Sequence, residues 1–268
     1  MSSRYLAEIS EAEAAGTVAE TYEDIRRVVG LPLVNLVYRT LAAEPGRLER
    51  IWAELRPNLL DRLAAEGAAE LLALGTTATG AVPLSERALA AAGTGPAELA
   101  LVSATVDAYC HANPRNLLAV TALLEGAPGT GRPEPAGTPP RPRPDVLPMA
   151  RLDTLPGATA ALLEEMGRPI AGEEEPVLVP SLYRHFAHDP CLLALLATAI
   201  APCLADGSLE RAAGRVAVRA RELLATLPRP VGRLEDGETR ATLERFAVAI
   251  PRMIVAGAAL SRALRAPA

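Results

Sequence analysis

Two stretches of sequence decide the fold: VNLVYRTLAAEPGRL at residues 34–48 and VPSLYRHFAHDPCLL at residues 179–193. Displaced by 145 positions, the first stretch places its Tyr-Arg pair, its proline and several apolar residues on the same residue types of the second. A displacement of 137 then matches the segment that begins at Pro114 with the segment that begins at Pro251. One helical unit therefore occurs twice in the chain, with a shorter middle loop in its second copy.

The rest of the sequence predicts an all-α protein. Runs such as residues 62–74 and 239–264 combine high helix propensity with apolar residues at three- and four-residue spacing, and no segment has a convincing strand pattern. We predict a first helical repeat at residues 1–125, a Pro/Gly-rich linker at 126–148 and a second repeat at 149–268. The two repeats would pack as an intramolecular pseudo-dimer with a pocket between the halves.

Composition excludes several classes of function. The chain of 268 residues carries a net charge of -5 and has 3% aromatic residues, so it offers neither a basic field nor stacking surfaces for nucleic acid. It contains no lysine, which rules out Schiff-base chemistry, pyridoxal phosphate anchoring and the lysine of a P-loop. No run of about 18 apolar residues and no signal-peptide pattern occur, so we expect a cytoplasmic protein that does not enter a membrane. We expect a small-molecule substrate and no cofactor, and a homodimer stays open.

The two copies differ most in one polar segment. Residues 107–116 read DAYCHANPRN, whereas the matching residues 244–253 read ERFAVAIPRM. Tyr109, Asn113 and Asn116 thereby correspond to an aromatic ring without a hydroxyl and to two apolar residues. Folding alone explains what the copies share, so a polar group present in one copy indicates a single polar pocket with an apolar mirror image.

The other copy is the more polar one around the Tyr-Arg pair. Ser181, Leu182 and His185 stand there in place of Leu36, Val37 and Thr40 of the first copy. One site could therefore draw side chains from both halves. The repeated Tyr-Arg pairs themselves favour an architectural role, with the guanidinium bonded to carbonyls or carboxylates, although an arginine could also clamp a substrate carboxylate.

Simpler structural roles compete with several of these hypotheses. Asn113 precedes a proline and could begin a helix. Asp107 and His111 lie four residues apart, which is typical of a solvated helix face with an ion pair, and less often of an Asp-His dyad. Asp189 before Pro190 is a good helix N-cap, and we expect no metal site around it.

The cysteines do not suggest disulfide or nucleophile chemistry. Cys191 and Cys203 would lie ~18 Å apart on one continuous helix, too far for a disulfide. Cys110 is expected to be a buried structural residue, because its neighbour His111 would point in another direction on a helix.

The duplicated layout, the two Tyr-Arg segments and DAYCHANPRNLLAVTAL at residues 107–123 resemble the group I 2-haloacid dehalogenases, the all-α kind that acts on both D and L substrates. The resemblance implies hydrolysis of the carbon-halogen bond without a covalent enzyme ester. An asparagine that positions the water then corresponds to Asn113. The aspartate that activates the water corresponds to Leu182, which follows Ser181, and pocket aromatics correspond to Leu33 and Leu36.

Leucine at position 182 cannot accept a proton, so ordinary haloacid hydrolysis is not expected unless Asp189 or Asp107 supplies the base. Three hypotheses follow: an enzyme of this fold, of hydrolase or cyclase type, with other acid/base or water-mediated chemistry, such as cyclisation, elimination or hydrolysis of a larger substrate; the family reaction with a relocated base; and a non-catalytic ligand-binding or partner protein. The candidate catalytic residues are Asn113, His111 and Tyr109. The candidate substrate-binding residues are Leu33, Leu36, Asn116, Ser181, Leu182, Tyr183 and His185.

Overall fold

The computed structural model describes residues 4–133 and 145–265. The first half contains α1 (Gly16–Val29), α2 (Leu36–Leu41), α3 (Arg47–Leu59), α4 (Arg62–Gly75), α5 (Glu86–Ala91), α6 (Pro96–Glu125) and β1 (Ala127–Pro128). The second half contains η1 (Leu152–Thr154), α7 (Gly157–Ala171), α8 (Ser181–Phe186), α9 (Pro190–Ala205), α10 (Ser208–Leu223), η2 (Leu224–Thr226), β2 (Pro230–Val231) and α11 (Gly237–Leu264).

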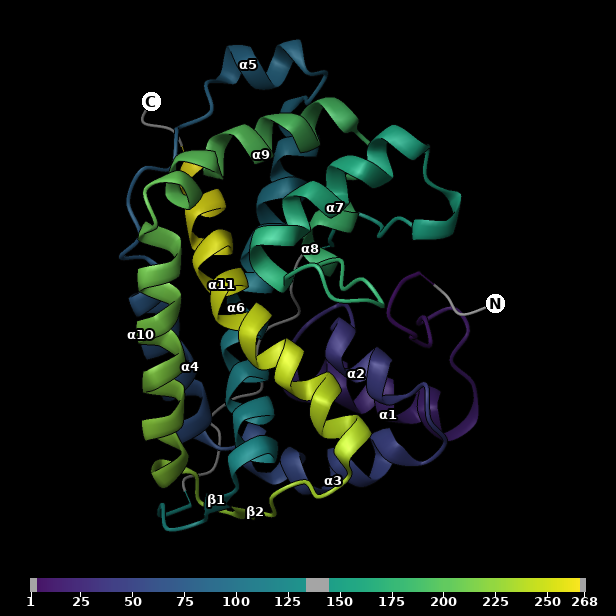
Figure 1. Ribbon diagram of the computed structural model, residues 1–268, viewed down its shortest axis with the longest axis vertical. Coiled ribbons are helices and arrows are strands. Elements are labelled where there is room, and N and C mark those ends of the chain that lie inside the picture. Colours follow the sequence, from purple (N-terminus) through teal and green to yellow (C-terminus); the bar gives the residue numbers. More distant parts are fainter. Residues whose placement is uncertain (1–3, 134–144, 266–268) are drawn as a thin grey trace.

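Four helices form the central layer of the protein (Figure 1). The long helices α6 and α11 run in opposite directions and make the most extensive helix-helix contact, while α4 packs on α6 and α10 packs on α11. The α1–α3 group and the α7–α9 group lie at opposite ends of the same side of this layer. Apolar residues of all these helices join in one continuous core, in which α8 packs against α6 and α2 packs against α11.

The residues at the helix ends explain where three of the helices begin. They also correct the expectation that Asn113 begins a helix. Asp61, Asp189 and Asp236 accept hydrogen bonds from backbone N–H groups in the first turns of α4, α9 and α11, as N-caps do. Asn113 is not such a cap, because α6 continues through Pro114 without a break. The apolar surroundings on both sides of this proline outweigh the single backbone hydrogen bond that it removes.

The prediction that no segment forms a strand was also incomplete. Ala127 and Pro128 pair with Pro230 and Val231 in an antiparallel two-stranded sheet. Segments this short carry no readable alternation. The pairing fixes the start of the expected linker to the segment before α11, whereas residues 134–144 of that linker lie outside the described residues.

The helix bounds follow the displacement read from the sequence. Both α2 and α8 have six residues, and their first and last residues are each 145 positions apart. Both α6 and α11 contain an internal proline, at Pro114 and Pro251, which are 137 positions apart.

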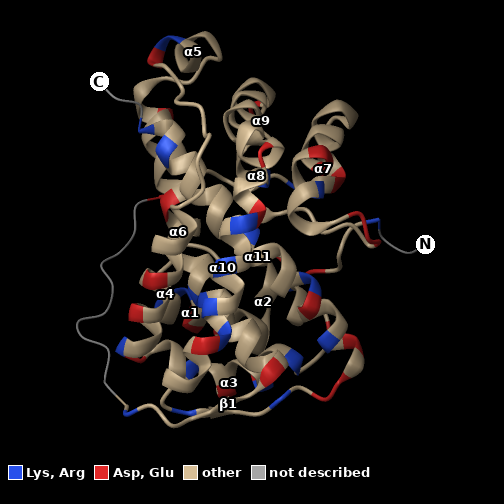
Figure 2. Ribbon diagram, turned by 60° about the vertical axis from the view of Figure 1, so that its left-hand side comes forward, with Lys and Arg blue, Asp and Glu red and all other residues tan. Residues whose placement is uncertain are grey.

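The surface carries charges of both signs, and the longest apolar helix lies inside the protein. Arginines and acidic residues alternate over the helices in Figure 2 without a large region of one sign. Among the described residues, α11 is the one single helix long and apolar enough to cross a membrane, but 67% of its apolar window is buried within the protein. That burial is typical of a helix at the centre of a helical core.

Candidate functional site

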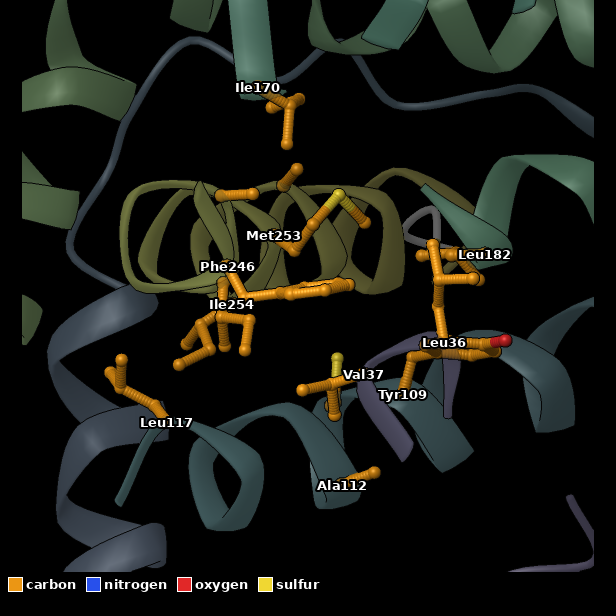
Figure 3. Packing of buried hydrophobic residues seen from close by; sticks show 14 of the residues in the cluster. Leu36, Val37, Tyr109, Ala112, Leu117, Ile170, Leu182, Phe246, Met253 and Ile254 are labelled. Atoms are coloured by element: carbon orange, nitrogen blue, oxygen red, sulfur yellow. The ribbon is translucent and has the colours of Figure 1, made fainter. Parts of the chain in front are cut away.

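A small cavity lies where α2 and α8 meet the two long helices. Its volume is about 40 Å³, which leaves room for a few water molecules. Figure 3 shows Leu182 beside Leu36 and Tyr109, with Phe246 and Met253 further along the cavity. The lining residues are Asn35, Leu36, Val37, Tyr109, Asn113, Asn116, Leu178, Pro180, Ser181, Leu182, Phe246, Ala249, Ile250 and Met253.

Most of the lining residues are pairs that the two displacements relate. Asn35–Val37 and residues 180–182 face the cavity from α2 and α8, and equivalent positions of α6 and α11 complete it. The α6 members are Tyr109, Asn113 and Asn116, whereas their α11 counterparts are Phe246, Ile250 and Met253. The cavity therefore has one polar wall opposite an apolar wall.

Leu182 lines this cavity, and no Asp or Glu side chain of the described residues lines it as a replacement base. Its side chain is fully buried, at 0% exposure. Asp189 accepts hydrogen bonds from the first turn of α9, and Asp107 pairs with Arg265 at 3.1 Å. Neither aspartate lines the cavity, so the hypothesis that one of them replaces the base is wrong. Within residues 4–133 and 145–265, no carboxylate lines it.

Tyr109 and His185 form a buried pair at the polar end of the cavity. The Tyr109 hydroxyl lies 3.1 Å from Nε2 of His185, and Nδ1 of His185 lies 2.5 Å from the backbone oxygen of Leu147. A carbonyl oxygen can only accept, so Nδ1 carries the ring proton of the neutral imidazole. Nε2 is then a free acceptor, and the tyrosine donates its proton to it.

Burial sets the protonation of both groups. It lowers the pKa of His185 to about 4 and raises the pKa of Tyr109 to about 12, although nearby Arg39 and a hydrogen bond from Ser181 oppose the latter shift. At neutral pH the pair is therefore uncharged, with a phenol that donates to an imidazole. Proton transfer through the pair needs only a short movement along an existing hydrogen bond.

The lowered pKa of His185 predicts a pH-dependent stability. At pH 7 the His185 imidazole is mostly neutral in both the folded and the unfolded protein. As the pH falls, the unfolded chain takes up a proton there near the ordinary histidine pKa of about 6.5, whereas the folded protein does so only near pH 4. Stability is therefore lost as the pH falls, by about 2 kcal/mol between about pH 7 and pH 4.5. Urea unfolding of wild type and of His185→Asn over this range should show the loss in wild type alone. Equal pH profiles would contradict the neutral, buried imidazole.

Four candidate residues do not line the cavity, and one of them, His185, reaches it only through Tyr109. His111 points to α1, where its Nε2 lies 3.2 Å from the backbone oxygen of Val29. Leu33 and Tyr183 are buried in the core. Helical direction explains the first case: His111 lies two positions from Tyr109, so the two side chains diverge by about 200° around α6. Asp107 pairs with Arg265 and accepts a hydrogen bond from Ser261 of α11.

The repeated arginines have an architectural role. Arg39 and Arg184, 1% and 7% exposed, approach the same carboxylate, Glu8 of the N-terminal segment, at 3.1 and 2.8 Å. Arg184 also donates to the backbone oxygen of Ala150, and an Nη2 of Arg39 lies 3.5 Å from Oγ of Ser181. The guanidiniums thus join both halves to the N-terminal segment rather than facing the cavity.

The remaining polar candidates are also accounted for. His185 points inward and Asp189 caps α9, and no group of three or more His, Cys, Asp or Glu residues in the described part of the chain is placed to hold a metal ion. Cys110 is buried against Gly257, and burial raises the pKa of its thiol to about 12, which disfavours a nucleophilic thiolate.

Sequence reasoning missed several residues of the site region. Asn35 was available as part of the unshared segment, and Phe246 and Met253 as partners of polar residues, but none was selected. Leu147 and Glu8 gave no signal, because neither lies in the repeat and both act through single long-range contacts.

The fold defines a class of protein: it is the all-α fold of solved D-2-haloacid dehalogenases. A D-2-haloacid dehalogenase mutant in complex with D-2-CPA matches with a TM-score of 0.80 over 97% of this chain and 95% of that chain, at 15% identity. The D-2-haloacid dehalogenase with L-LA matches with a TM-score of 0.74 over 97% and 94%, at 17% identity.

Curated proteins give the same relationship from sequence, although no model of a known protein family matches the chain. A configuration-inverting 2-haloacid dehalogenase of Alcaligenes xylosoxydans xylosoxydans is 34% identical over 121 residues, 45% of this chain and 41% of the relative. An (R)-2-haloacid dehalogenase of Pseudomonas putida is 30% identical over 79 residues, 30% of this chain and 26% of the relative. The matches span less than half of either relative. They confirm that the chain is related to the group I 2-haloacid dehalogenases, at modest identity.

Proposed function

We propose that this chain is an enzyme of the all-α dehalogenase fold that acts on a small organic molecule by proton transfer through Tyr109 and His185, without a covalent intermediate. The observation that carries the proposal is the exchange of groups at one cavity: Leu182 stands where the family's base is expected, and a Tyr-His pair lies beside it. Carboxylate-activated hydrolysis of 2-haloacids is not part of the proposal.

The pair can take a proton from a water molecule or a substrate hydroxyl. The donor's O–H bond breaks and its proton moves to the Tyr109 oxygen, while Tyr109 passes its own proton to Nε2 of His185. The electron pair stays on the donor oxygen, which attacks the substrate, and the leaving group departs with its own pair. The imidazolium then returns its proton by the same route. A conjugate acid with a pKa of about 4 makes His185 as strong a base as an ordinary aspartate, at about 3.9.

Asn113 supports this chemistry from the polar wall. Its amide lines the cavity one helical turn from Tyr109, on the same face of α6. An amide there can orient water or substrate by giving and accepting hydrogen bonds at once. Asn113 keeps in this proposal the positioning role that the resemblance implies.

We also propose that the two halves form an intramolecular pseudo-dimer with one asymmetric site. Equal lengths and the 145-residue spacing of α2 and α8 support it, as does the pairing of the lining residues. On this proposal the symmetric features stabilise the fold, and the polar substitutions in one half create the site.

A second candidate is the family reaction with the Tyr-His pair as the relocated base, which the dehalogenase relatives favour. The test is halide release from (R)- and (S)-2-chloropropionate. We expect no halide above a protein-free control, because the lining residues give the carboxylate of the haloacid no cationic partner. Release that is lost in Tyr109→Phe would support the second candidate instead. Release that persists in Tyr109→Phe would contradict both.

A further inference from the structure

The charge of the residues around the cavity restricts the ligands that the cavity can bind. None of its lining residues, all within the described parts of the chain, carries a formal charge. Arg39 and Arg184 do not line the cavity and both pair with Glu8, at 3.1 and 2.8 Å, while Arg39 lies 3.5 Å from Oγ of the lining residue Ser181. A carboxylate in the cavity would lose its hydration without gaining a cation in direct contact, and an unpaired charge is costly to bury.

One acceptor on the polar wall lacks a partner. Asn116 is 1% exposed and lines the cavity, yet its Oδ1 has no hydrogen bond to any described residue. A buried polar atom is normally satisfied, so this oxygen indicates a donor that comes from outside the chain. The Tyr109 oxygen adds a second acceptor, since its own proton is directed to His185.

The opposite wall is entirely apolar. Leu182 of α8 and Phe246, Ile250 and Met253 of α11 present carbon and sulfur atoms to the cavity. A ligand must therefore place an N–H or O–H group towards α6 and a short alkyl part towards α11.

From these contacts we infer that the cavity binds an uncharged small molecule with an N–H or O–H donor on a short alkyl body, such as a primary amide or an alcohol, and excludes carboxylates. This inference names the substrate class of the proposed enzyme and rests on that proposed function. Asn116 is the residue that selects the donor.

Propionamide and propionate provide a matched pair of probes, because they have the same shape and differ in charge and in the N–H donor. Titrations of the full chain, followed on the methyl NMR signals of Leu36, Val37 and Leu182, should give an affinity for propionamide at least about tenfold higher than for propionate. Asn116→Leu should weaken propionamide binding by about tenfold. Thr121→Val, a buried polar-to-apolar change on α6 outside the cavity, is the control and should change it by less than about threefold.

Each outcome decides the inference. Propionate binding as tight as propionamide, no propionamide shifts at these methyls, or equal effects of the two variants would overturn it. The measurement needs no catalysis, so loss of proton transfer in Tyr109→Phe would count against the proposed function alone. Failure of the binding preference would count against the substrate class alone.

Discussion

Replacing Leu182 with aspartate should raise halide release from 2-chloropropionamide, the uncharged amide of the haloacid, above that of wild type. The new carboxylate would enter the cavity beside Tyr109 and opposite Asn113, where it can accept a proton from water. A positioned base contributes at least about a hundredfold in rate, so we expect release that many times above wild type. The buried charge should also lower the free energy of unfolding by on the order of 3 kcal/mol, measured by urea denaturation.

The matched control is Leu182→Asn, which has nearly the same shape as aspartate but no basic oxygen. It should release no more halide than wild type, and should lose less stability because no charge is buried. Equal halide release by the asparagine and aspartate variants would contradict the assignment of position 182 as the missing base. A well-folded aspartate variant that releases no more halide than wild type would contradict the expected gain.

Replacing Glu8 with glutamine should destabilise the fold by about 3–5 kcal/mol. Two guanidiniums that are 1% and 7% exposed share this single carboxylate, so the neutral amide leaves both charges buried without an anion. Arg39 and Arg184 also come from the two halves of the chain, and their repulsion would then act across the interface between α2 and α8. Urea unfolding measured at neutral pH gives the loss directly.

Glu13→Gln is the control for the same N-terminal segment. Glu13 lies 4.0 Å from Arg151, with both side chains more than half exposed, and such surface pairs contribute about 0–1 kcal/mol. A stability loss for the Glu8 variant no larger than that of the control would contradict the role of Glu8 as the shared partner of both arginines.

Much of the fold was predictable because helices are encoded locally. The matched segments 34–48 and 179–193 each contain a six-residue helix, α2 and α8, and the N-cap at Asp189 was predicted from the residues directly beside it. The same rule gave a wrong prediction for Asn113. Asn before Pro favours the start of a helix, but α6 continues through both residues because they are packed in the core. The strands at Ala127 and Pro230 were missed, because two residues carry no periodicity.

Part of the cavity lining was predicted because comparison of the two matching segments identifies positions at which they differ in polarity. Tyr109, Asn116 and Leu182 were selected as residues in which the copies differ, and all three line the cavity. His111 was selected on the same ground, yet it faces α1. A difference between copies identifies a polar side chain, but the side of the helix on which it lies depends on its angle relative to its neighbours.

The sequence by itself determined the all-helical fold and the 145-residue correspondence between the segments that contain α2 and α8, since each depends on residues close in the chain or on direct comparison of two segments. Only the tertiary structure decided that His185 joins Tyr109, 76 residues away, and that Glu8 joins arginines of both halves. Such contacts leave no periodic pattern in the sequence, because they form when the packing of α6, α8 and α11 brings distant side chains together and excludes the water that would otherwise solvate them.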